Sequence, residues 1–340
     1  MMTPILRTAL LAAALACPSL LRAQSCTLAP ADRAWIQSAL DGWQHASGES
    51  LRQGARPLPW IVLFDTACAW HLNPAADAGL AATSETFRFD GNDVPVRSLV
   101  HQGKVWIPNG DTVPAQGLAF AAPRGDRGET FFVMALVPVW KRDPRNASDP
   151  DPEQLFHAVF VHEMTHTLQV AAVGRVLDRL SARDTLPADM TDDLIQNRFG
   201  ERDGFRAAYE AERDLLFAAA TATDNATART LARRALDAAR ARRARFFTGP
   251  DSVYGAVEDI FLAMEGPAQW AAYRVMQRRA DLSVGDQDVL ARLRRGGRWW
   301  SQDEGLALFL VIDKLLPGWQ SRVLSREPAS VWALLDEATR

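Results

Sequence analysis

Apolar residues in the first half of the chain occur in short runs whose length is typical of β-strands. The clearest runs cover 60–65 and 130–140, and turns such as Asp-Gly-Asn and Asn-Gly-Asp separate shorter ones. Pro138 lies inside the longest run and favours an edge position there, because proline cannot donate to a strand ladder. An amphipathic helix over 30–46 precedes the strands. The shorter strands are expected at 86–89, 94–100 and 104–107.

The second half has apolar residues at helical spacing instead. After a polar linker over 141–152, a helix is predicted whose N-terminus Asp149 or Asp151 can cap, with Pro152 in its first turn. Apolar residues on several of its faces predict burial, and Gly174 is expected to weaken or end it. Further helices are expected over 203–222, over 227–247, from near 252 with an interruption at Gly266-Pro267, and from a Ser301/Glu304 capping box towards 316.

This order of elements predicts an α+β fold with a β-rich N-terminal lobe over 24–150 and a mainly helical region over 151–340. The segment 227–247 carries seven arginines, which are expected to form a solvated face paired with neighbouring acids. The net charge of −3 argues against a nucleic-acid partner, since such a partner favours a basic domain.

The first residues have the pattern of a secretory signal peptide. Arg7 precedes a short apolar core over 8–16, and a cut after Ala23 would leave a mature chain that begins at 24. The alternative is a lipoprotein acylated at Cys17. No later stretch approaches 18 uncharged apolar residues, so no integral membrane span is expected. The sequence therefore predicts export to the periplasm or the medium.

Two cysteines, Cys26 and Cys68, remain after removal of the signal peptide. An even pair in an exported chain is typical of a disulfide, because thiols oxidise and stay oxidised in that environment. The predicted bridge ties the mature N-terminus to the first strand region.

The second-half helix carries the sequence His162-Glu163-Met164-Thr165-His166. Residues four apart lie one above the other on a helix, so both imidazoles can reach one metal ion. Glu163 then lies beside that ion, where a general base is needed. The segment resembles the HExxH motif of zinc metallopeptidases.

A catalytic zinc needs a third protein ligand. No histidine follows His166, so a downstream ligand has to be a carboxylate. Glu265 lies in Met264-Glu265-Gly266-Pro267-Ala268-Gln269-Trp270-Ala271-Ala272-Tyr273, which resembles the EGxAxY segment of gluzincin-type peptidases. Glu258, seven residues earlier, is expected to support the site from the same helical face. Three other glutamates stay open as third ligands: Glu210 with its ExxxD spacing to Asp214, its neighbour Glu212, and Glu304 in a second EGxA segment.

The resemblance implies a zincin-like fold and one Zn²⁺ per chain, held by His162, His166 and Glu265. It implies Glu163 as the general base in the hydrolysis of a peptide or protein substrate. An oxyanion donor is also expected, for which Tyr209, Tyr254, Tyr273 and His157 are available. Two other functions are compatible with the motif: a zinc hydrolase acting on another class of substrate, and a periplasmic binding or scaffold protein with a vestigial site.

Overall fold

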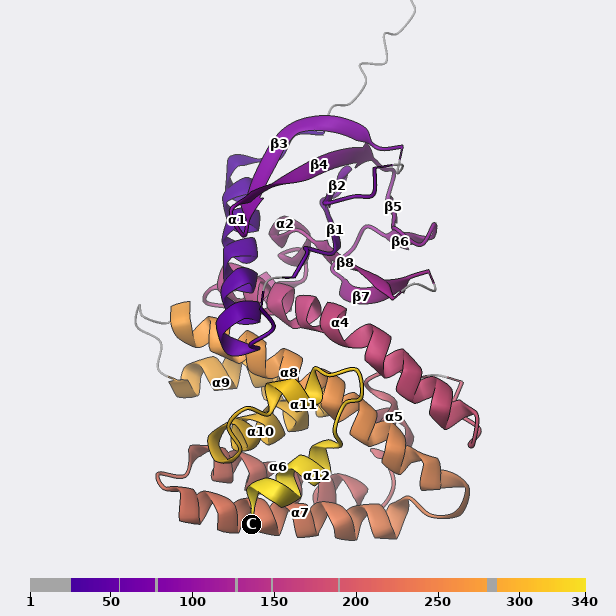
Figure 1. Ribbon diagram of the computed structural model, residues 1–340, viewed down its shortest axis with the longest axis vertical. Helices are drawn as coiled ribbons and strands as arrows, with labels where there is room; N and C mark the ends of the chain where they lie inside the picture. Colours follow the sequence, from indigo (N-terminus) through magenta and orange to yellow (C-terminus); the bar gives the residue numbers. More distant parts are fainter. Residues whose placement is uncertain are drawn as a thin grey trace, which may run out of the picture.

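The computed structural model describes residues 26–54, 56–76, 79–125, 128–147, 149–188, 190–279 and 286–340. The predicted signal peptide, 1–23, and Cys17 lie outside the described residues. In Figure 1 a β-sheet forms one end of the molecule and a group of helices the other, with helix α4 crossing between them. The structure thus has the predicted α+β class, with the sheet built from the N-terminal half and the helices mostly from the C-terminal half.

The main sheet has six strands in the order β3-β4-β2-β1-β8-β7. Strands β1 and β8 are parallel, and every other neighbouring pair is antiparallel. A separate antiparallel pair is formed by β5 and β6. The strands are β1 (Trp60–Phe64), β2 (Cys68–Leu72), β3 (Ala81–Phe89), β4 (Asn92–Val100), β5 (Lys104–Trp106), β6 (Thr112–Pro114), β7 (Ala119–Arg124) and β8 (Glu129–Ala135).

Strand β1 is apolar at every position because both faces of the sheet are covered. Ile61 and Leu63 face the main core, which includes α1 (Pro30–His45), while Val62 and Phe64 face a second core that includes Val105 of β5. Alternate residues of a strand point to opposite faces, so a strand covered on both sides is uniformly apolar. This burial explains the continuous apolar run in the sequence.

The prediction of one strand over 130–140 with an edge position is wrong. Strand β8 ends at Ala135, and Val137–Trp140 forms the short helix α2, with Pro138 in its first turn. The missing N–H of proline is tolerated there because the first N–H groups of a helix have no intrahelical partner. Strand β8 is interior, between β1 and β7, and β7 is the edge strand on this side of the sheet.

Helix α4 (Pro152–Ser181) carries the HExxH segment and is capped by Asp151, whose side chain accepts a hydrogen bond from the Gln154 N–H at 3.1 Å. The helix continues through Gly174, where the sequence predicted a weak point or an end. One glycine costs a helix about 1 kcal/mol relative to alanine. Val173, Val176 and other apolar residues around it pack against the α8 side of the core, which keeps the helix intact.

The remaining helices form the second half of the molecule, and α8 packs against both α4 and α10. Helix α8 is continuous through Gly266 and Pro267, so the predicted interruption is wrong. Helix α10 begins at Trp300 without a side-chain cap, so the predicted Ser301/Glu304 capping box is wrong as well. The helices are α3 (Pro144–Ala147), α5 (Leu194–Phe199), α6 (Phe205–Thr221), α7 (Asn225–Phe246), α8 (Tyr254–Arg279), α9 (Asp286–Arg294), α10 (Trp300–Leu315), α11 (Gln320–Val323) and α12 (Val331–Ala338).

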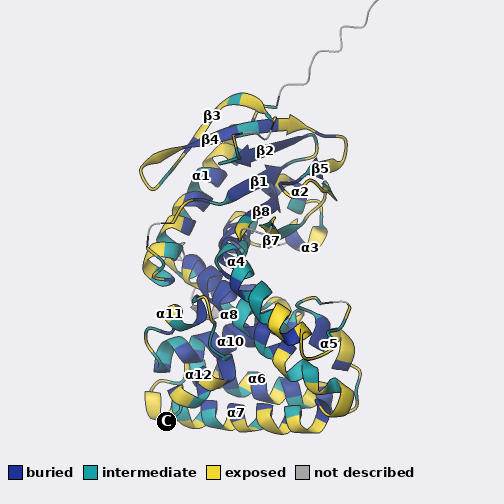
Figure 2. Ribbon diagram, turned by 45° about the vertical axis from the view of Figure 1, so that its right-hand side comes forward, coloured by how far each residue is buried: buried dark blue, intermediate teal, exposed yellow. Residues whose placement is uncertain are grey.

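The predicted disulfide between Cys26 and Cys68 is present and attaches the segment before α1 to the start of β2. Among the described residues, no helix combines the length and apolar character needed to cross a bilayer. Figure 2 shows that the residues at the centre, on α4, α8 and α10, are largely buried.

Candidate metal centre

Three side chains from two helices converge in the buried centre of the molecule. His162 and His166 of α4 face each other with their Nε2 atoms 2.9 Å apart. Glu265 of α8 places one carboxylate oxygen 3.2 Å from Nε2 of His162 and the other 3.4 Å from Nε2 of His166. All three residues are buried, and within the described part of the chain they are the group whose ligand atoms can converge on one metal ion.

The residues fit a metal ion in spacing and in chemistry. A tetrahedral zinc with bonds of about 2.0–2.1 Å has neighbouring ligand atoms about 3.3 Å apart, close to the separations of the three ligand atoms. The Glu265 Oε2 atom is buried without a hydrogen-bond partner, which costs free energy unless something else satisfies it. Two imidazoles and a carboxylate with a converging unsatisfied oxygen are a donor set that a divalent transition metal can satisfy.

The orientation of His166 depends on Pro267 through a chain of hydrogen bonds. Pro267 has no N–H, so the carbonyl of Ala263, four residues earlier in α8, lacks its helical donor. Gln169 supplies a donor instead: its Nε2 donates to the Ala263 carbonyl at 3.2 Å and to the Met264 carbonyl at 3.0 Å. Its Oε1 lies 2.9 Å from Nδ1 of His166. This bond selects the tautomer with the proton on Nδ1 and leaves the Nε2 lone pair for a metal.

Gln169 is not among the site residues predicted from the sequence, although its position carries a signal. Gln169 lies three residues after His166, and residues three apart share a helix face. A buried amide on the same helix face as the two histidines needs hydrogen-bond partners. The spacing could therefore have predicted a contact between Gln169 and His166.

Glu163 lies beside the metal-binding group and borders a cavity of about 260 Å³. The backbone N–H of Ala121, in the edge strand β7, donates to its carboxylate. Burial raises the pKa of Glu163 to about 7; the charge of His166 opposes this rise, and the carboxylates of Glu265 and Asp192 add to it. A carboxyl group with a pKa in this range can accept and return a proton near neutral pH.

The pKa of Glu265 is shifted in the opposite direction. Burial alone would raise the pKa of Glu265, but the positive charge that a protonated His166 or His162 carries outweighs burial, so the pKa lies below its usual range. This direction favours the anionic form of Glu265, which is the form that can bind a metal ion.

The structure does not bring the other glutamates to this group. Glu212, Glu258 and Glu304 gather in a separate buried cluster around Arg242, which donates to Glu212 at 2.9 Å and to Glu258 at 2.7 Å. Glu258 therefore does not support the metal-binding group as expected. Arg242 is likewise buried, whereas the sequence predicted a solvated arginine face. Burial raises the pKa of Glu304, and the nearby carboxylates add to this rise. Glu210 is half-buried on α6.

None of the four proposed oxyanion donors lines the cavity at Glu163. Tyr209 is buried and donates to the Trp300 carbonyl at 2.7 Å. Tyr254 packs beside Phe199 in another part of the core, and Tyr273 accepts a hydrogen bond from Gln277 at 2.9 Å. His157 stacks on Trp35, with its Nε2 3.3 Å from the Trp35 carbonyl.

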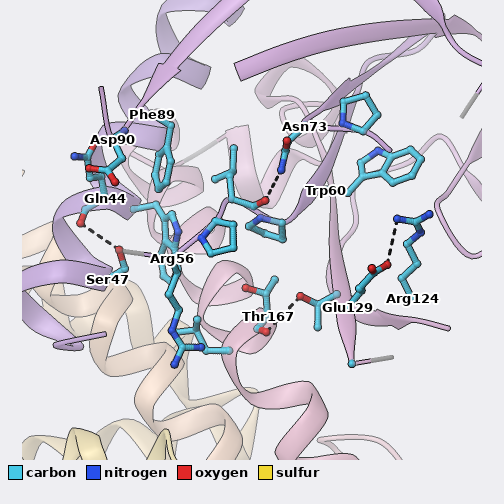
Figure 3. Close-up of a pocket in the computed structure, with 18 of the residues that line it drawn as sticks. Gln44, Ser47, Arg56, Trp60, Asn73, Phe89, Asp90, Arg124, Glu129 and Thr167 are labelled. Carbon is cyan, nitrogen blue, oxygen red and sulfur yellow. Dashed lines mark hydrogen bonds and ion pairs between the residues drawn. The ribbon is translucent and has the colours of Figure 1, made fainter. Parts of the chain in front are cut away.

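A larger pocket of about 800 Å³ opens on the β-rich lobe and reaches α4 at Thr167, one residue after His166 (Figure 3). Its wall includes Trp60 of β1 and Arg124 of β7, and Arg124 forms an ion pair with Glu129 at 3.3 Å. The metal-binding residues do not line it. It shares no lining residue with the cavity at Glu163 and is separate from it.

Comparison with protein-family models, with curated proteins and with solved structures finds no match to this chain.

Proposed function

We propose that this chain is an exported zinc-dependent peptidase of the gluzincin type with a zincin-like fold, in which His162, His166 and Glu265 hold one zinc ion. The observation that carries the proposal is the convergence of the three ligand atoms, from two helices about 100 residues apart in sequence, at separations of 2.9 to 3.4 Å. Glu163, the base of the HExxH segment, lies next to them on a cavity.

A zinc ion held there would polarise the scissile carbonyl and lower the pKa of a bound water to about 7. Glu163 accepts the proton of the attacking water on its carboxylate and passes it to the amine that leaves. The Ala121 N–H of the edge strand favours the ionised form of this carboxylate, which is the form that accepts the proton. Gln169 keeps the proton of His166 on Nδ1 throughout.

The edge strand β7 offers a place for an extended substrate. Backbone groups of alternate residues in a strand point to opposite sides. The Leu118 carbonyl accepts a hydrogen bond from the N–H of Ala135 at the end of β8, and the Ala121 N–H points to Glu163. The N–H and C=O of Ala119, which borders the cavity, therefore face away from β8 and can pair with a peptide main chain. The disulfide agrees with an exported location.

Metal content and peptide hydrolysis test the proposal together. Protein loaded with zinc and dialysed should contain one zinc per chain by elemental analysis. Glu265→Gln should lose it, and Glu304→Gln, which changes the other Glu-Gly segment, should keep it. In a peptide-library digest, Glu163→Gln should retain zinc and lose about 10²- to 10⁴-fold of the wild-type activity.

Each failure has a separate meaning. Wild-type protein that binds zinc but cleaves no peptide would exclude the peptidase function and direct attention to other hydrolytic substrates. Wild-type protein that binds no zinc would contradict the metal centre itself and favour a binding or scaffold protein.

A further inference from the structure

The cavity beside Glu163 has an apolar wall and one cationic side chain. Trp140, Phe156, Val159 and Trp299 contribute to the wall, and Arg295 contributes the charge. Its volume of about 260 Å³ is just below the range of about 300–1,000 Å³ that is typical of pockets for drug-sized ligands. A space of this size next to the general base suits a single residue of a peptide substrate.

Arg295 is held in this cavity by a buried partner that is not an acid. Its Nη2 donates to Oδ1 of Asn146 at 2.7 Å, and Nδ2 of Asn146 donates to the Trp140 carbonyl at 3.3 Å. Asn146 is only 6% exposed, so its amide is a fixed support. A guanidinium has five N–H donors in a planar fork, and among the described residues Asn146 is the one acceptor of a side-chain hydrogen bond from Arg295.

Arg295 differs from the neighbouring arginines in its ion pairing. Arg292 binds Asp149 at 2.7 Å and Arg294 binds Asp303 at 2.8 Å, whereas within the described residues Arg295 has no carboxylate within ion-pair distance. Its guanidinium lies over the ring of Trp299, at 5.0 Å from the ring centre, and Arg298 lies over the same ring at 4.8 Å.

Burial also acts on the guanidinium of Arg295. Burial lowers the pKa of Arg295, and the like charges of Arg298 and Arg145 lower it further against the attraction of Asp149 and Asp143. An anion entering the cavity would offset the cost of burying this charge.

The backbone at Arg295 is also unusual. Arg295 has a φ of 47°, and it is followed by two glycines with φ of 72° and 71°. A left-handed backbone disfavours side chains and favours glycine, so an arginine at this position is held there at a cost in free energy. Strained residues of this kind concentrate at ligand-binding sites.

We propose that Arg295 is a specificity-determining residue that binds a carboxylate of the substrate in the cavity beside Glu163. The carboxylate belongs either to an aspartate or glutamate side chain or to the C-terminus of the peptide. A guanidinium matches both because it can form two parallel hydrogen bonds to a carboxylate. The inference rests on the proposed peptidase function and adds a substrate class to it.

The test is a peptide series digested by zinc-loaded protein. Each position in turn holds Glu, Gln, Ala or Lys, and each peptide is made with a free and an amidated C-terminus. For the wild type we expect kcat/KM to be at least 10-fold higher when a carboxylate is present at one defined position. The two arms distinguish the sources, because a side-chain preference survives amidation and a terminal preference does not.

Variants then assign the preference to the residue. Arg295→Ala should reduce the carboxylate-to-amide ratio of kcat/KM by roughly 10- to 100-fold, as expected for lost hydrogen bonds to a charged group. Arg295→Lys should keep part of the preference, because it retains the charge and loses the fork. Arg298→Ala is the matched control: it removes a guanidinium from the same tryptophan outside the cavity lining and should leave the ratio within about 3-fold.

The outcomes separate this inference from the proposed function. Peptide cleavage without a carboxylate preference, or with a preference unchanged in Arg295→Ala, overturns the role of Arg295 and leaves the peptidase function standing. Failure of the wild type to cleave any peptide overturns the peptidase function, and the substrate class with it.

Discussion

The backbones of Gly266 and Gly305 touch where α8 crosses α10. A Cβ atom built on Gly305 would lie 2.8 Å from Cα of Gly266, closer than such contacts occur in proteins. Each glycine follows a buried glutamate, Glu265 or Glu304, in the same Glu-Gly-x-Ala pattern. The two copies of the pattern therefore meet at one close crossing, one copy on α8 and the other on α10. Glu265 faces the histidines of α4, while Glu304 faces the cluster around Arg242.

This crossing predicts a strong effect of Gly266→Ala. The added methyl group would meet a ring carbon of Phe309 at 2.3 Å and the Gly305 carbonyl oxygen at 2.9 Å. We expect the free energy of unfolding to fall by about 1–3 kcal/mol, as for other overpacked cores. Zinc affinity should fall as well, because α8 has to shift at the residue next to Glu265. Denaturant unfolding and zinc titration measure the two effects.

Gly174→Ala is the matched control for that substitution. Gly174 also lies inside a helix that carries proposed metal ligands, but a Cβ there meets nothing within 4 Å. It should stabilise the protein by about 0.5–1 kcal/mol and leave zinc affinity unchanged. Equal stability of the two alanine variants would contradict the close crossing as the reason for Gly266.

Gln169→Ala should weaken zinc binding by about 10- to 100-fold, the usual cost of removing a hydrogen bond that orients a ligating histidine. It removes the partner of His166 Nδ1 and also leaves the Ala263 carbonyl without a side-chain donor. Competition against a chelator of known affinity measures the change. Gln320→Ala is the control, since Gln320 is a buried glutamine that donates to the Ser50 carbonyl far from the site. A loss of zinc affinity as large in Gln320→Ala would show that the effect reflects general stability.

His71 predicts a loss of stability in acid. Burial lowers its pKa from 6.5 to about 4, and its Nδ1 accepts a hydrogen bond from Trp60 Nε1 at 3.1 Å. The unfolded chain binds a proton at His71 below pH 6.5, and the folded chain does so only near pH 4. Stability from this group is therefore fully present above pH 6.5 and falls as the pH drops towards 4, by about 3 kcal/mol in all.

Urea unfolding at pH 7.5, 5.5 and 4.5 measures this slope. His71→Asn is the comparison, because its Oδ1 can still accept from Trp60 while the side chain does not titrate. The variant should be less stable at pH 7.5, yet lose about 2.5 kcal/mol less than the wild type between pH 7.5 and 4.5. Parallel pH profiles for the two proteins would contradict the assignment to His71.

Local patterns in the sequence were sufficient for several features. The four-residue spacing of His162 and His166 places both imidazoles on one face of α4 wherever that helix lies, because the spacing depends on helix geometry alone. The apolar run of β1 and the cap at Asp151 could also be predicted, because each depends only on residues that are close in sequence. The Cys26–Cys68 bridge could be predicted because only two cysteines follow the predicted signal peptide.

The tertiary structure decided the features that depend on contacts between distant segments. Glu265 and Glu304 have the same local sequence pattern, and only the crossing of α8 with α4 and α10 determines which of them meets the histidines. The edge position of β7 follows from the order of the strands in the sheet, and the sequence of one strand does not specify that order. Helix α8 continues through Pro267 because a side chain from another helix satisfies the carbonyl that proline leaves free. In each case the deciding free energy comes from packing and hydrogen bonds across the fold, and local propensity contains no information about these partners.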